Sequence, residues 1–371
     1  LATNLTYHPA RKPSRSAIYI GQEPRWNIPD YRPSLPKLWA LFQILGYSGT
    51  FHLISASPSR TSLCNIKIRK SLLTRTLLNM HPLTLFVAAL PLATQANAAL
   101  QRVTNFGSNP TGLTMDISVP PNLSASPAII LALHGCGGSG AAYSRQAEYI
   151  PLSDAKGTFV VIYPSSSRDF NCWDVATTAS LTRDGGGDST GLANMIRYTI
   201  AQYGADPKRV FVTGSSSGCM MTNVLTATYP DLFAATSCYS GVAAGCLAGS
   251  PGSSPISADP TCANGLVVKT GEQWAAQVRA MYPGYNGSYP RVQTFHGTAD
   301  SLVKYPNLAE QLKEWSTIHG VSFAKNNTNT PISGYTQIIY GDGTKLVGYS
   351  AQGVGHTVPV QEDQDLKWFG L

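Results

Sequence analysis

A serine set between glycines is the residue of this chain best suited to covalent chemistry. The run Thr213-Gly214-Ser215-Ser216-Ser217-Gly218 follows the apolar residues 210–212, and this order predicts a strand, a sharp turn and a helix. In a Gly-x-Ser-x-Gly turn the glycines remove side chains where strand and helix would collide, so the serine can expose its hydroxyl. The pattern predicts a nucleophile elbow with Ser216 at its tip, although short Gly/Ser strings are also common in loops.

An acid and a base follow downstream in the order that such a nucleophile requires. Asp300 ends the segment 292–300, where a short apolar strand runs into a turn, and His356 lies in a glycine-flanked loop near the C-terminus. The chain has seven histidines. His356 is the one that lies in a loop after the acid, since His319 falls in the helix-like stretch 308–319. The alternative is that Asp300 caps a turn and His356 is a surface histidine.

A glycine-rich loop offers donors for a developing negative charge. The apolar run 129–133 predicts a buried strand, and it ends in His134-Gly135-Cys136-Gly137-Gly138. Backbone N–H groups of Gly135 and Cys136, together with that of Ser217 at the start of the elbow helix, could bind the carbonyl oxygen as it becomes an oxyanion. The alternative is a glycine-rich connection without chemistry.

The elements that must position these residues alternate between strands and helices. A helix is expected from Asp188, as its cap, to Tyr203, because apolar residues recur there at helical spacing, and another should run from the elbow to about Tyr229. Besides the segments above, strands are expected at 113–119, 158–163 and 233–239. Such alternation predicts an α/β fold in which helices cover both faces of a mostly parallel sheet.

Seven short motifs follow one another along the chain. They are 134–138 (HGCGG), 171–174 (NCWD), 185–188 (GGGD), 214–218 (GSSSG), 281–285 (MYPGY), 296–300 (HGTAD) and 353–359 (GVGHTVP). Taken in order, they resemble the fungal secreted esterases of carbohydrate esterase family 1, a group that contains acetylxylan and feruloyl esterases and is related to polyhydroxybutyrate depolymerases. The resemblance covers residues 100–371 and implies a single α/β-hydrolase domain with a triad of Ser216, Asp300 and His356.

The resemblance also implies an activity and a substrate. We expect a secreted, extracellular serine esterase that removes acetyl groups from xylan through an acyl-enzyme, as a monomer and without a cofactor. Feruloyl ester cleavage on plant cell-wall polysaccharide is the close alternative, because the plain loop after the third strand leaves the acyl group open. A polyhydroxyalkanoate depolymerase and a non-catalytic polysaccharide-binding protein are more distant alternatives. Trp173 is expected to form an aromatic wall for a sugar or acyl group, unless it packs in the core.

The chain divides into three parts by composition. Residues 80–98 combine a short apolar core with Ala-x-Ala, the pattern of a signal peptide cleaved after Ala98. The core, residues 81–94, has fourteen residues interrupted by two prolines and is too short to span a bilayer as a helix. Residues 1–79 carry 11 Lys and Arg against 2 Asp and Glu, while the remainder carries 16 against 18. We expect this basic extension to be poorly ordered and to arise from translation upstream of the true start; the alternative is an arm that binds membranes or nucleic acid.

The catalytic domain is expected to occupy residues 99–371, long enough to bury a substantial core. Its slightly acidic balance gives no reason to expect nucleic acid as a partner.

The cysteines of this domain indicate an oxidising compartment. Six of the seven in the chain lie beyond Ala98, and an even number in an exported chain favours disulfides, here expected as Cys136–Cys172, Cys219–Cys238 and Cys246–Cys262. Free buried thiols are the alternative, since six cysteines allow about fifteen connectivities. No close Cys/His spacing of the zinc kind occurs, so no metal is expected. Glycosylation sequons begin at Asn122, Asn286 and Asn326.

Overall fold

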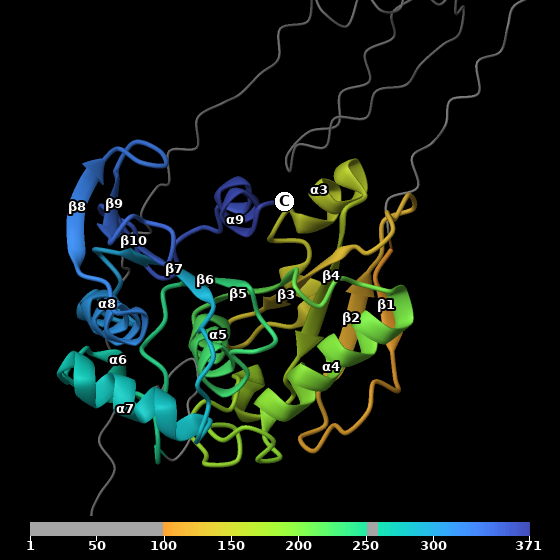
Figure 1. Ribbon diagram of the computed structural model, residues 1–371, viewed down its shortest axis with the longest axis horizontal. Helices are drawn as coiled ribbons and strands as arrows, with labels where there is room; N and C mark the ends of the chain where they lie inside the picture. Colours follow the sequence, from red (N-terminus) through yellow and green to blue (C-terminus); the bar gives the residue numbers. More distant parts are fainter. Residues whose placement is uncertain (1–98, 251–258) are drawn as a thin grey trace, which may run out of the picture. The chain divides into compact units, whose positions relative to one another are not determined.

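The computed structural model describes residues 99–250 and 259–371. The expected extension (1–79) and signal peptide (80–98) lie outside these residues. The described chain forms one ten-stranded sheet in the order β1-β2-β4-β3-β5-β6-β7-β10-β9-β8 (Figure 1). The strands are β1 Gln101–Val103, β2 Thr114–Ser118, β3 Ala128–Leu133, β4 Phe159–Ser165, β5 Val210–Ser215, β6 Ala235–Tyr239, β7 Arg291–Gly297, β8 Phe323–Thr328, β9 Tyr335–Tyr340 and β10 Leu346–Ala351.

The centre of the sheet is parallel, as the alternation of elements predicts. Strands β4, β3, β5, β6, β7 and β10 pair in parallel with their neighbours. Both margins are antiparallel, formed by β1 and β2 on one side and by β9 and β8 on the other. Every strand expected from the sequence is present.

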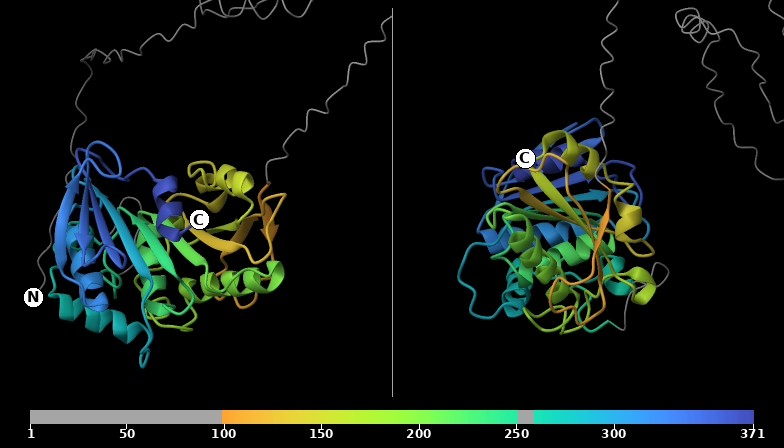
Figure 2. Two further views of the ribbon diagram at one scale, coloured as in Figure 1. Left: turned by 45° about the horizontal axis from the view of Figure 1, so that its top comes forward. Right: turned by 90° about the vertical axis from the view of Figure 1, so that its right-hand side faces the viewer.

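Helices cover both faces of this sheet (Figure 2). On β3, Ile129 and Leu131 join the core under α4 and α5, while the alternate residues Ile130 and Ala132 join the core under α3 and α9. This is the alternation that a pleated strand buried on both sides requires. The helices are α2 Gly140–Tyr143, α3 Tyr149–Lys156, η1 Asp169–Asn171, α4 Asp188–Tyr203, α5 Ser217–Thr228, α6 Pro260–Ala263, α7 Gly271–Met281, α8 Pro306–His319 and α9 Glu362–Phe369.

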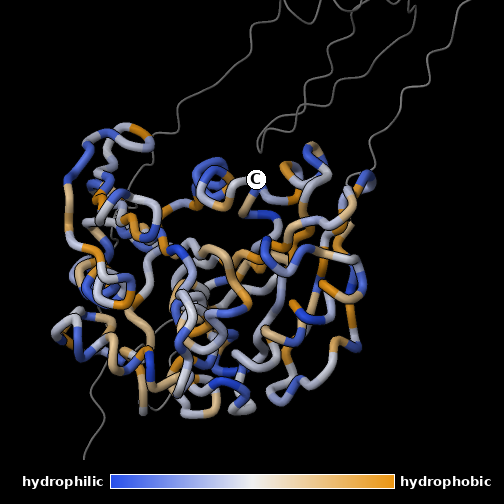
Figure 3. Tube along the Cα trace, viewed as in Figure 1, coloured by the Kyte–Doolittle hydropathy of each residue, from blue (hydrophilic) through white to orange (hydrophobic). Residues whose placement is uncertain are grey.

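Hydropathy follows these layers. The central strands carry hydrophobic stretches, and hydrophilic residues concentrate in the outer helices and loops (Figure 3). Among the described residues, no helix combines the length and the apolar character needed to cross a membrane.

The start of α4 differs from the sequence prediction. Gly187 is the N-cap, and Asp188 is the first helical residue rather than the cap. The buried carboxylate of Asp188 instead accepts the backbone N–H of Asp174 at 2.9 Å, and its own N–H donates to Ser180 Oγ at 2.8 Å. The prediction of a capping Asp188 is therefore wrong, because this side chain fixes the preceding loop instead of the helix end.

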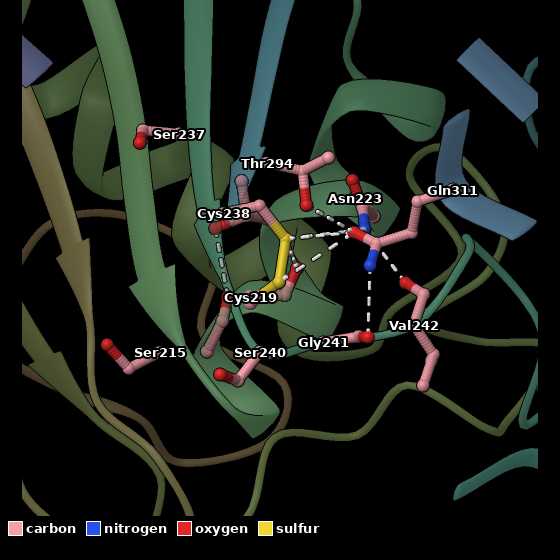
Figure 4. Close-up of a disulfide and its surroundings, with 12 residues drawn as sticks. Ser215, Cys219, Asn223, Ser237, Cys238, Ser240, Gly241, Val242, Thr294 and Gln311 are labelled. Carbon is pink, nitrogen blue, oxygen red and sulfur yellow. Dashed lines mark hydrogen bonds between the residues drawn. A yellow bond between two sulfur atoms is a disulfide. The ribbon is translucent and has the colours of Figure 1, made fainter. Parts of the chain in front are cut away.

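All three expected disulfides are present: Cys136–Cys172, Cys219–Cys238 and Cys246–Cys262. The second joins α5 to β6 beside a buried amide cluster (Figure 4). There, Gln311 Oε1 accepts hydrogen bonds from Asn223 Nδ2 at 2.9 Å and Thr294 Oγ1 at 3.0 Å. This cluster connects α5 and α8 with β7, and it holds the helix that begins immediately after Ser216.

The parallel strands bring the loops of interest to one edge. Strands β3, β5, β7 and β10 run in the same direction, so the loops that follow them leave the sheet at a common end. Ligands of open α/β sheets bind at this end.

Candidate active site

Ser216 lies at a sharp turn between β5 and α5. Its backbone has φ 55° and ψ −120°, which is strained for a residue with a side chain. A Cβ on Gly214 would lie 2.4 Å from backbone atoms of Gly218, and one on Gly218 would lie 2.2 Å from the Leu133 carbonyl oxygen. Only glycine fits at both positions, so the steric reason for the Gly-x-Ser-x-Gly pattern holds in the structure.

The structure brings Ser216, His356 and Asp300 together in one chain of hydrogen bonds. His356 Nε2 lies 2.8 Å from Ser216 Oγ, and His356 Nδ1 lies 2.7 Å from Asp300 Oδ2. Because a carboxylate only accepts hydrogen bonds, Nδ1 carries the hydrogen and Nε2 is left free to accept the serine proton. This arrangement can activate a hydroxyl as a nucleophile.

Asp300 is held as a carboxylate by several donors. Its Oδ1 accepts the backbone N–H groups of Leu302 at 3.0 Å and Val303 at 2.9 Å. Burial alone would raise the pKa of Asp300, but hydrogen bonds from His296, His356 and Val303 outweigh it and lower the pKa well below its usual range. The acid of the site therefore stays ionised.

The loop after β3 lies against the nucleophile. A Cβ on Gly135 would be 3.2 Å from Ser216 Cβ, so the backbone of this loop passes directly beside the serine. Cys136 follows and lines the same cavity as Ser216, and Ser217, the first residue of α5, follows Ser216 in the chain. The three predicted oxyanion-hole residues are thus adjacent to Ser216.

Trp173 does not form the expected aromatic wall. Its side chain is only 1% exposed, so it cannot present a face to a substrate, and that prediction is wrong. Its indole N–H donates to the His134 carbonyl at 2.8 Å, and its backbone N–H donates to Ser217 Oγ at 2.8 Å. Trp173 therefore fastens the loop after β3 to the elbow helix, in agreement with the core-packing alternative.

Sequence reasoning missed the parts played by two buried histidines. His134 Nδ1 donates to the Gly135 carbonyl at 2.7 Å, while its Nε2 accepts the Ser166 N–H at 3.3 Å. Burial lowers the pKa of His134 despite the hydrogen bond to Gly135, which favours this neutral state. His296 lies with Nε2 at 2.7 Å from the Val303 carbonyl and 3.5 Å from Asp300 Oδ2. Each is the first residue of a motif named above, 134–138 or 296–300, and this was the available signal.

A cavity of about 690 Å³ opens beside Ser216 and His356. Its walls include the loop 135–139, Tyr143, the segment 357–360 and the residues Glu148 and Glu362. The volume lies within the range of pockets that hold small organic ligands. Within residues 99–250 and 259–371, no cluster of His, Cys, Asp and Glu could hold a metal ion.

Comparisons with known proteins identify a matching family and several similar proteins. Residues 113–325 match the family described as esterase PHB depolymerase. Feruloyl esterase B of Talaromyces stipitatus is 49% identical over 290 residues, which cover 78% of this chain and 80% of that protein. Probable acetylxylan esterase A of Aspergillus niger is 47% identical over 294 residues, covering 78% and 94%.

A solved structure agrees with these matches. The acetyl xylan esterase from Aspergillus awamori is 48% identical and superimposes with a TM-score of 0.70, covering 73% of this chain and 99% of that one. The resemblance inferred from seven motifs is confirmed, as are the α/β-hydrolase fold and the assignment to the carboxylic ester hydrolases. The chain belongs to the esterase PHB depolymerase family.

Proposed function

We propose that this protein is a secreted serine esterase that removes acetyl groups from xylan, with Ser216 as nucleophile, His356 as base and Asp300 as the acid that orients it. The observation that carries the proposal is the continuous hydrogen-bond chain from Ser216 Oγ through both nitrogens of His356 to Asp300. Relatives of this chain are named feruloyl esterase and acetylxylan esterase, and both names support an ester as the substrate.

The proposed reaction follows from the protonation of His356, whose Nδ1 carries the hydrogen and whose Nε2 is free to accept a proton. His356 Nε2 takes the proton of Ser216 as the serine oxygen attacks the ester carbonyl carbon, and Asp300 stabilises the resulting imidazolium. The backbone N–H groups of Cys136 and Ser217, with Gly135 beside them, bind the oxyanion. The proton passes from His356 to the sugar oxygen as the C–O bond breaks and the acyl-enzyme forms. Water then attacks the acyl-enzyme by the same route and releases the carboxylic acid.

Feruloyl ester cleavage is the second candidate function, and the size of the cavity supports it. A volume of about 690 Å³ exceeds what an acetyl group needs and leaves room for a hydroxycinnamoyl group. Several relatives at 49–51% identity are named feruloyl esterase B. In either case the alcohol part of the substrate is a plant cell-wall polysaccharide.

Export fits the chemistry of the described residues. Three disulfides are typical of an oxidising, extracellular compartment. The sequon residues Asn122, Asn286 and Asn326 are all exposed, as glycosylation requires. We propose that the mature enzyme acts outside the cell as a monomer on acylated xylan, without a cofactor, a nucleic acid or a membrane as partner.

Replacing the nucleophile tests the mechanism. Ser216→Ala should lower the rate of ester hydrolysis by about 10⁴-fold or more while leaving the fold intact. Hydrolysis of 4-nitrophenyl acetate and covalent labelling by an organophosphate measure the effect, with circular dichroism as the check on folding. A folded variant that keeps more than a tenth of the activity would show that another residue is the nucleophile.

Parallel assays on acetylated xylan and methyl ferulate separate the two candidates, with Ser216→Ala as the blank for each. Acetate release without ferulate cleavage supports the acetylxylan esterase, and the reverse result supports the feruloyl esterase. If neither substrate is cleaved but organophosphate labelling is intact, the substrate is another ester, such as a polyester. A wild-type protein that is neither active nor labelled would instead be a non-catalytic polysaccharide-binding protein.

A further inference from the structure

An exposed aromatic side chain stands three residues before the buried Trp173, on a segment whose backbone is bonded to the loop that lines the cavity. Phe170 is 70% exposed, although single exposed hydrophobic residues are common and need no special explanation. Two further observations set Phe170 apart: the backbone that carries it and the contacts that hold that backbone.

The backbone at Phe170 is unusual. Three consecutive residues, Asp169, Phe170 and Asn171, have φ angles of 45°, 58° and 59°. Residues with a side chain rarely adopt this left-handed conformation, and each costs about 1–2 kcal/mol relative to the right-handed one. A bulky aromatic residue is least expected there. Strained backbone of this kind persists where the surrounding structure enforces it, and it is concentrated at functional sites.

The enforcing contacts come from the loop after β3. The Phe170 carbonyl accepts the N–H of Gly137 at 2.7 Å, and Asn171 Nδ2 donates to the Gly138 carbonyl at 3.0 Å. The disulfide Cys136–Cys172 joins the same two segments covalently. Phe170 is therefore fixed to the very loop that lies against Ser216, and Gly137 and Gly138 line the cavity.

The side chain of Phe170 is not part of the cavity wall, and this determines what it can bind. The ester carbonyl must reach Ser216 inside the cavity, so the part of a polymeric substrate that stays outside is the sugar chain. A pyranose ring has a face of C–H groups that carry partial positive charge, and the face of an aromatic ring is negative. Stacking of the two buries apolar area without leaving any sugar hydroxyl unpaired, because the hydroxyls point outward to water.

We propose that Phe170 is a binding platform for the xylan backbone, on which a sugar residue near the scissile ester stacks. The inference rests on the proposed action on an acylated polysaccharide and adds the residue that recognises the polymer outside the cavity. The strained, disulfide-fastened segment keeps the backbone that carries the ring in place before substrate arrives, so little backbone freedom is lost on binding.

A matched pair of variants tests the platform. Phe170→Ala removes the ring, and Phe323→Ala removes another phenylalanine that is 53% exposed but lies on β8, at the margin of the sheet. Phe170→Trp preserves an aromatic face. Each variant and the wild type are assayed on acetylated xylan and on 4-nitrophenyl acetate, an ester of the same acid without a sugar.

Phe170→Ala should lower kcat/KM for acetylated xylan by about two- to tenfold, through a higher KM, and leave 4-nitrophenyl acetate hydrolysis unchanged. Phe170→Trp and Phe323→Ala should match the wild type on both substrates. The proposal is overturned if Phe170→Ala matches the wild type on xylan. It is also overturned if both activities fall together, which would assign Phe170 to supporting the loop 134–138. If the wild type releases no acetate from xylan, the proposed function itself fails, and that result is distinct because it does not involve a variant.

Discussion

Two buried aspartates in this molecule accept several hydrogen bonds each, and yet their pKa values are shifted in opposite directions. Asp300, next to His356, has a pKa well below its usual range, whereas full burial raises the pKa of Asp365 on α9 to about 6. Both side chains are removed from water, at 6% and 0% exposure of the residue. Burial alone therefore does not decide whether a carboxyl group is ionised.

The donors around each aspartate explain the difference. Asp300 receives two backbone N–H groups and lies against two imidazoles, one of which becomes a cation in the proposed reaction. Asp365 is surrounded by neutral groups, and the negative charge of Glu362 nearby raises its pKa further. Its partners are Tyr149 Oη, Ser237 Oγ at 2.6 Å, Tyr239 Oη at 2.6 Å, Gln293 Nε2 at 2.8 Å and Thr213 Oγ1 at 3.3 Å.

The two environments suit two different tasks. A catalytic acid partner must be ionised at the moment when the imidazole takes a proton. Asp365 has no such partner, and its contacts fasten α9 to residues on β5, β6 and β7. The comparison teaches that a charged carboxylate is maintained here where chemistry needs it, and a carboxyl of intermediate pKa is tolerated where only packing needs it.

The largest effect is expected from removing the charge of Asp300. In Asp300→Asn the amide can donate toward His356 Nδ1, which favours the wrong tautomer and leaves the imidazolium without a counter-charge, so kcat should fall by about 10⁴-fold. Steady-state hydrolysis of 4-nitrophenyl acetate measures this loss. Asp365→Asn is the matched control, and we expect its kcat to stay within about threefold of wild type, since it does not touch the reacting atoms. Comparable losses in the two variants would erase the proposed distinction between the two acids.

The titration of Asp365 should instead affect how the free energy of unfolding depends on pH. Between the unfolded value of about 3.9 and the folded value of about 6, the folded state binds more protons than the unfolded chain. Its contribution to the free energy of unfolding therefore falls as the pH rises through this window, by up to about 3 kcal/mol. Asp365→Asn has no such contribution, so its destabilisation relative to wild type should be larger at pH 4 than at pH 7.

Guanidinium chloride unfolding of both proteins across this pH range, with the disulfides intact, gives the required difference. Subtracting the free energy of unfolding of the variant from that of the wild type cancels, to first order, the contributions of all other titrating groups. A destabilisation that is the same at pH 4 and pH 7 would mean that Asp365 titrates alike in the folded and unfolded states.

Local sequence patterns predicted the parts of the site that lie on loops with a strict steric demand. The elbow at Ser216 could be predicted because only glycine fits at 214 and 218. The required order of nucleophile, acid and base left few alternatives to Asp300 and His356 as triad residues. The strands were predictable because buried parallel strands are continuous apolar runs. An even number of cysteines in the exported domain favoured disulfides, and the three expected pairs are present.

What could not be predicted depends on contacts between distant segments. The sequence predicted that Trp173 would contact substrate. Whether an aromatic ring faces solvent or the core depends on the loop that packs against it, which here is the loop that contains His134. The exposed Phe170, three residues earlier, carries no distinguishing sequence pattern. Asp365 lies on a helix whose sequence is polar. Its donors come from α3 and from strands β5, β6 and β7, and all except Gln293 are more than a hundred residues away along the chain.

The smallest effect that we predict concerns His296, the second imidazole at Asp300. Its Nε2 lies between two acceptors, the Val303 carbonyl at 2.7 Å and Asp300 Oδ2 at 3.5 Å, and therefore carries the hydrogen. Its Nδ1 is buried without a hydrogen-bond partner in the described part of the chain. The hydrogen bond from His296 contributes to the lowered pKa of Asp300, so its removal should raise that pKa toward the ordinary value.

His296→Leu should accordingly lower kcat by about tenfold, because a donor that holds the Asp300 carboxylate is lost while the triad itself remains. His296→Gln retains a donor at a similar distance from the backbone and should recover most of the rate. Equal losses in the two variants would assign His296 to packing alone, and the ionisation of Asp300 would then depend on His356 and the backbone donors.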